Sequence, residues 1–177
     1  MNTALEQNTL EMPVADTKKI ERAMELINSL DFTMVKRKLM DEEEGQGWDE
    51  EYTNHVEQRY KRFLCMLIVN DGHSVVPTKN IDQFWHQHIL DTRAYAKDCQ
   101  TIMGKFIHHF PYFGMRSEQD AQDLLDSFEE TKAFYFNLFG EEYTKEFNDG
   151  TNSSKCHRGT THCIKCEGGC SSTTKCR

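Results

Sequence analysis

The strongest constraint on the fold is the spacing of the apolar residues between positions 80 and 103. They recur at intervals of three and four residues, which matches one face of an α-helix rather than the alternation of a strand. Similar spacing begins near residues 16, 31, 49 and 117, whereas valine-rich alternating runs are scarce. The sequence therefore predicts an all-α protein, a single bundle of about five helices.

Local signals predict where the helices begin and end. Asp31 can cap the second helix, and Ser117 opens the last one with a capping-box pattern. We expect one uninterrupted central helix over Asn80–Met103, ended by Gly104. A loop rich in aromatic residues follows, and Pro111 makes it stiff.

Charge and composition divide the 177 residues into three parts. We expect a disordered lead-in over residues 1–15, a helical domain over 16–147, and a flexible linker with a Cys/His-rich tail over 148–177. The tail carries a net charge of +3, which leaves −11 on the rest. An acidic body disfavours nucleic acid as a partner. The sequence shows neither a signal-peptide pattern nor an apolar run that could span a membrane, so we expect a cytoplasmic protein that does not bind membranes.

The central segment also carries an unusual group of polar side chains. Projected on one helix, His88 lies amid the apolar face, whereas His86 points away, so these two histidines cannot share a metal ion. Imidazole, carboxylate, phenol and thiol groups all bind metals or carry protons. The candidate residues for such a site are His88, Asp91, Tyr95, Cys99, His108 and His109. The two loop histidines are expected to fold back over the helix. The alternative is that His88 is a core histidine with satisfied hydrogen bonds, and that Tyr95 and Cys99 are packing residues.

The tail offers a second candidate site, for a metal ion. Its Cys-x2-Cys pair and a Gly-Gly turn allow several thiolates to reach one tetrahedral ion. The candidate ligands are Cys156, His162, Cys163, Cys166, Cys170 and Cys176. Zinc is the expected metal, with copper(I) or an iron–sulfur cluster as alternatives. The tail can instead be a redox segment, a substrate for modification, or simply disordered.

Spaced motifs across the helical part resemble a known family. They are Tyr60-x-x-Phe63-Leu64, Val76-Pro77-Thr78, Ile81-Asp82, Trp85-His86-x-His88, Leu90, Tyr95, Asp98-Cys99 and Gly104. Over roughly residues 31–142 the chain resembles the helical domain of the glycine-rich domain-containing proteins of plants and their bacterial relatives. The resemblance implies an all-helical domain and no defined chemistry. The chain departs from the family because it lacks a long glycine-rich region and ends in the cysteine tail instead.

These patterns lead to three hypotheses for function. The first is a non-enzymatic protein that binds zinc through its tail and a protein or peptide partner in an aromatic groove between the central helix and the loop that follows it. The second is a small metalloenzyme or peptide-modifying factor that uses the central histidine group. The third is a precursor whose tail cysteines are modified while the helical part serves for recognition.

Overall fold

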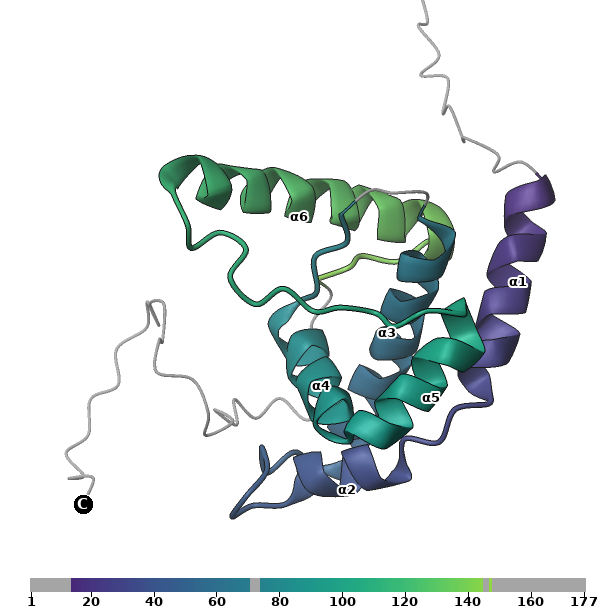
Figure 1. Ribbon diagram of the computed structural model, residues 1–177, viewed down its shortest axis with the longest axis vertical. Coiled ribbons are helices and arrows are strands. Elements are labelled where there is room, and N and C mark those ends of the chain that lie inside the picture. The colour runs from purple at the N-terminus through teal and green to yellow at the C-terminus, as the bar shows by residue number, and fades with distance from the viewer. Residues whose placement is uncertain (1–13, 71–73, 145–146, 148–177) are drawn as a thin grey trace, which may run out of the picture.

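The computed structural model describes residues 14–70, 74–144 and 147, and that part of the chain contains six α-helices and no strand. The helices are α1 (Val14–Asn28), α2 (Thr33–Met40), α3 (Glu50–Val69), α4 (Lys79–Leu90), α5 (Thr92–Met103) and α6 (Glu118–Phe139). The all-α prediction is confirmed. In Figure 1, α3 runs through the centre, with α1 beside it, α2 across one end and α6 across the other. Most of the predicted lead-in and the whole cysteine tail lie outside the described residues. Helix α1 begins at Val14, two residues before the predicted start of the helical domain at residue 16.

The core lies where α3 meets α1, α2 and α4. At its centre, the ring of Phe32 packs edge-on against Tyr60, Phe84 and His88, with ring centroids 5.0–5.6 Å apart. All four residues are buried. Edge-to-face contacts between aromatic rings add specific geometry to the burial of apolar surface. This cluster therefore holds α4 in a fixed rotation on α3.

The predicted central helix is in fact two helices, which accounts for the sixth. Asp91 has ψ of 74°, outside the helical range, and its carboxylate accepts a hydrogen bond from the Ala94 amide at 3.2 Å. An Asp side chain competes for backbone N–H groups in this way, so it favours a cap over a helix interior. Gly104 then ends α5 in the left-handed conformation (φ 71°), as predicted.

The C-terminal helix α6 is attached by the buried Tyr135, by apolar side chains that pack against the core, and by several hydrogen bonds. Arg62 donates to the Tyr135 hydroxyl at 2.9 Å and to the Glu141 carboxylate at 2.7 Å. The Val76 amide donates to Thr131 at 3.0 Å, and the Tyr143 hydroxyl donates to the Val76 carbonyl at 3.0 Å. Through these contacts α6 lies across the end of α3 (Figure 1). The loop from α5 to α6 therefore has to cross the face of the bundle above α4.

The side chains predicted to cap α2 and α6 accept backbone hydrogen bonds there, and Asp49 does the same at the start of α3. The Asp31 carboxylate accepts from the Thr33 amide at 2.9 Å, although Phe32 occupies the cap position itself. The Ser117 hydroxyl accepts from the Asp120 amide at 3.1 Å. Asp49, at the predicted start of the third helix, accepts from the Tyr52 amide at 2.7 Å. Within the described residues, no helix is both long and apolar enough to cross a bilayer.

Candidate functional site between helix α4 and the aromatic loop

His88 lies at the C-terminal end of α4 and is only 2% exposed. Its Nδ1 accepts from the Tyr60 hydroxyl at 2.9 Å, and its Nε2–H donates to the Asp98 carboxylate at 3.1 Å. Burial lowers the pKa of His88, while the hydrogen bond and the charge of Asp98 act to raise it. The neutral imidazole is therefore favoured, and both of its nitrogens have protein partners.

The carboxylate beside His88 is not the predicted one. Asp91 caps α5 and is exposed, so it is not the carboxylate that hydrogen-bonds His88, although its charge also acts to raise the pKa of His88. Asp98, seven residues further along, takes its place because α5 turns back against α4. The projection on one helix could not find this pair. The signal that could have revealed it is the Leu90-Asp91-Thr92 sequence, read as a helix start.

Tyr95 connects α4, α5 and the loop that follows. The Trp85 indole N–H donates to the Tyr95 hydroxyl at 2.9 Å, and this hydroxyl donates to the Ile107 carbonyl at 2.6 Å. Trp85, Tyr95 and Ile107 are all buried, and burial raises the pKa of the Tyr95 phenol. Cys99 is buried on the same helix. The relay from Trp85 through Tyr95 fixes the start of the loop against α4.

Of the two loop histidines, His109 returns to α4 but contacts residues other than His88. The two ring nitrogens of His88 are hydrogen-bonded to Tyr60 and Asp98. His109 packs edge-on against Trp85 instead, with ring centroids 4.4 Å apart. Its Nε2 lies 2.9 Å from an oxygen of Asp82. His108 is exposed and contacts the ring of Phe106. The expectation that both histidines cover His88 is therefore wrong, because the Trp85–Tyr95–Ile107 relay places the loop over the other side of α4.

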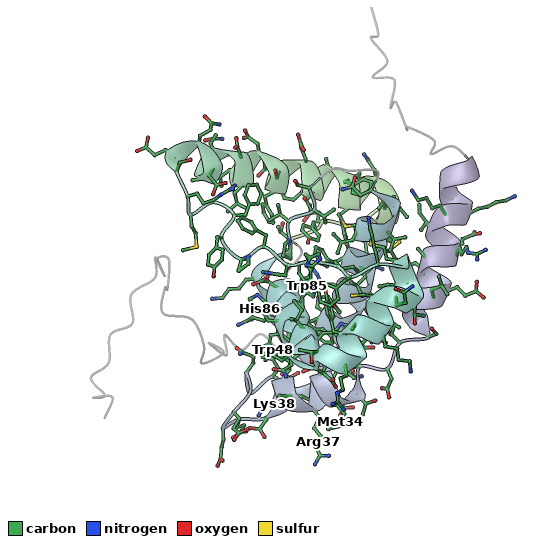
Figure 2. The ribbon with its side chains drawn as sticks, viewed as in Figure 1. Met34, Arg37, Lys38, Trp48, Trp85 and His86 are labelled. Atoms are coloured by element: carbon green, nitrogen blue, oxygen red, sulfur yellow. The ribbon has the colours of Figure 1, made fainter. Side chains whose placement is uncertain are left out.

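That side of α4 carries a group that sequence reasoning missed. Asp82 and His86 are four residues apart and share one face of the helix, and His109 completes the group from the loop. His86 is half exposed, in agreement with its predicted place on the polar side. The Asp-x-x-x-His spacing was visible in the sequence, but the third member is 23 residues away. Figure 2 shows Trp85 and His86 on the part of α4 that lies beneath the loop.

The aromatic loop, residues 105–116, is an ordered surface with exposed rings. Four large hydrophobic side chains on it are 47–77% exposed: Phe106, Phe110, Tyr112 and Met115. Its far end is tied to α6 by Asp120, which accepts from the amides of Gly114 and Arg116 at 2.7 and 3.1 Å. The Arg116 guanidinium, together with these amides, lowers the pKa of Asp120 to about 2. The backbone is thus held at both ends while the rings face solvent.

The predicted tail ligands cannot be placed. Cys156, His162, Cys163, Cys166, Cys170 and Cys176 all lie outside the described residues. The two described cysteines, Cys65 and Cys99, are buried and free, and burial raises the pKa of the Cys65 thiol to about 11. A thiol with so high a pKa is a poor nucleophile near neutral pH.

Comparison with known proteins identifies the family. The family profile described as UCP032817-like matches residues 22–132, which is more than half of the chain. The chain belongs to the UCP032817-like family. Every residue of the His88 network and of the Asp82–His86–His109 group falls inside the matched range. Both groups are thus part of the UCP032817-like segment and not of the tail.

Two curated proteins of Arabidopsis thaliana are similar to this UCP032817-like chain. Glycine-rich domain-containing protein 2 is 34% identical over 91 residues, which cover 49% of this chain and 11% of that protein. Glycine-rich domain-containing protein 1 is 31% identical over 107 residues, which cover 58% of this chain and 12% of that protein. The similarity therefore spans only about a tenth of these relatives. No solved structure matches the chain.

Proposed function

We propose that this domain is a protein-interaction module that binds a partner polypeptide through the aromatic loop. The observation that carries the proposal is the exposure of four large hydrophobic side chains on a loop whose backbone is fixed. Exposed apolar residues gathered in one place are typical of interaction sites. Aromatic side chains are enriched among the residues that dominate binding energy.

The fixed backbone supports binding without a large entropic cost. The Tyr95–Ile107 hydrogen bond holds one end of the loop, and Asp120 holds the other. A surface that is already ordered loses little conformational freedom when a partner docks. The loop therefore resembles a preformed binding surface more than a segment that folds on binding.

Charge indicates the chemistry of the partner. The loop contains no Asp or Glu, Lys105 stands at one end and Arg116, paired with Asp120, at the other, whereas the chain as a whole carries −8. Arg116 lies over the ring of Phe110, 5.1 Å from its centroid. A peptide with apolar or aromatic residues flanked by carboxylates complements this loop and is repelled by the acidic surface elsewhere. We therefore expect an acidic, aromatic peptide segment as the partner.

Selection from a library of displayed 12-residue peptides tests the proposal. The recovered peptides should be rich in aromatic and acidic residues. Their affinity, measured by fluorescence polarisation, should fall at least tenfold, about 1.4 kcal/mol, for the double variant Phe110→Ser/Tyr112→Ser. Thermal unfolding should be unchanged, since both side chains are exposed.

The matched control is Leu90→Ser, which replaces a hydrophobic residue outside the loop that is more exposed than Phe110 or Tyr112. This variant should bind the selected peptides like the parent protein. Peptides without an acidic bias, or peptides that bind the loop variant as tightly as the parent, would contradict the proposal.

A further inference from the structure

The cluster formed by Asp82, His86 and His109 has the composition of a metal site. One donor atom from each residue lies within 4.8 Å of the others. The Asp82 carboxylate is 2.9 Å from Nε2 of His109 and 3.7 Å from Nε2 of His86. The two imidazole rings are 4.6 Å apart between centroids. Three donors therefore already converge on one point.

The fold brings the three side chains together, because α4 positions Asp82 and His86 and the ordered loop positions His109. Asp82 and His86 lie one helical turn apart on α4, so their side chains are neighbours. The side chain of His109 is only 14% exposed and packs against the buried Trp85. Two residues before it, the Ile107 carbonyl is held by Tyr95. The most buried ligand is therefore the one that comes from the loop, and the helix supplies the other two.

We propose that Asp82, His86 and His109 bind a divalent transition-metal ion, with zinc as the probe of choice. Two imidazoles and one carboxylate are a common ligand set for zinc and for iron(II). Tetrahedral zinc with bonds near 2.1 Å needs donors roughly 3.4 Å apart, which is close to the observed separations. Calcium and magnesium prefer shells of oxygen, and this cluster offers a single carboxylate.

Three protein ligands leave at least one coordination position for another donor. His86 is half exposed, so solvent reaches the cluster. With a metal ion bound, water or a donor atom of a bound molecule would take this position. Metal binding here does not require the loop to bind a partner, because all three ligands belong to this chain.

Zinc titration of the full chain tests the site, provided that the tail is silenced. In the parent for this experiment Cys156, Cys163, Cys166, Cys170 and Cys176 are replaced by Ser, which removes thiolate ligands. Isothermal titration calorimetry should detect one zinc ion per chain. His86→Gln and Asp82→Asn should each weaken zinc binding at least tenfold. Loss of an outer-shell partner typically costs roughly 10- to 100-fold in metal affinity, and these residues are proposed as direct ligands.

His108→Gln is the matched control, because it removes an exposed histidine from the same loop without touching the cluster. It should bind zinc like the parent. Nitrogen-15 NMR of the histidine rings should show zinc-dependent shifts for His86 and His109 and none for His88. Unchanged affinity in His86→Gln and Asp82→Asn, an equal loss in His108→Gln, or no binding by the parent would each overturn the proposal. Since His86 is half exposed, its variant is expected to fold normally, which circular dichroism checks.

Discussion

At His88, burial and hydrogen bonding act in opposite directions on one imidazole. The ring is enclosed by Phe32, Tyr60 and Tyr95, and the carboxylate of Asp98 borders its outer nitrogen. Because both nitrogens are occupied, the ring has no free position for a metal or a substrate proton. The alternative interpretation of the sequence, a core histidine with satisfied hydrogen bonds, is the one that this geometry supports.

The lowered pKa of His88 makes stability depend on pH. Unfolding restores a pKa near 6.5, so between that pH and the lower pKa of the folded state the unfolded chain binds more protons. The contribution of His88 to stability should therefore decline as the pH falls below about 6.5, and level off below the pKa of the folded state. Urea unfolding between pH 5 and 8 should show this slope in the wild type and a smaller slope in His88→Gln.

His108→Gln provides the comparison, because His108 is exposed. Its slope should match that of the wild type. A proton NMR titration that places the midpoint of His88 at or above 6.5 would contradict the prediction.

At the level of elements, the path of the aromatic loop brings its backbone close to α6 at Gly114. Gly114 has φ of 87°, and a Cβ atom there would lie 2.5 Å from Cδ2 and 3.3 Å from Cβ of Leu124. The amide of the same glycine donates to Asp120. The positive φ and the close approach to Leu124 therefore both favour glycine at this position.

Gly114→Ala should destabilise the protein more than Gly104→Ala. Both glycines have positive φ, so each alanine costs roughly 1–2 kcal/mol in backbone strain. Only at Gly114 does the new methyl group also collide with a neighbour, since nothing lies within 4 Å of a Cβ at Gly104. Urea unfolding measures the difference. If both variants lose the same free energy of unfolding, α6 has moved to accept the methyl group. If the double variant Gly114→Ala/Leu124→Ala recovers the additional loss, that loss is due to the collision with Leu124.

The helix boundaries show what local sequence can predict. Ser117 and Gly104 act through their own backbone or the next turn, and each is found in its predicted role; Asp49, near the predicted start of the third helix, caps it. Asp91 acts locally as well, but the apolar spacing continues across it, so the periodicity gave no sign of the break. The consequence was large, because a helix that turns back places Asp98 instead of Asp91 beside His88.

For the whole molecule, the zinc site predicted in the tail remains a prediction. Metal analysis of the purified full chain should find zinc, and the content should fall by about one equivalent when the five tail cysteines become serine, since thiolates are the strongest zinc ligands there. His86→Gln should keep the tail-bound equivalent. Equal zinc content with and without the tail cysteines would contradict the prediction, and intact-mass measurement would then reveal whether those cysteines are covalently modified.

The sequence by itself determined the helical class, most helix ends and the burial of His88, because these follow from side chains that act within one or two turns. Only the tertiary structure decided which side of α4 His109 meets. That choice depends on the Trp85–Tyr95–Ile107 relay and on the turn at Asp91, which join residues on separate elements. Contacts between separate elements leave no period in the sequence, so the Asp82–His86–His109 cluster became visible only in three dimensions.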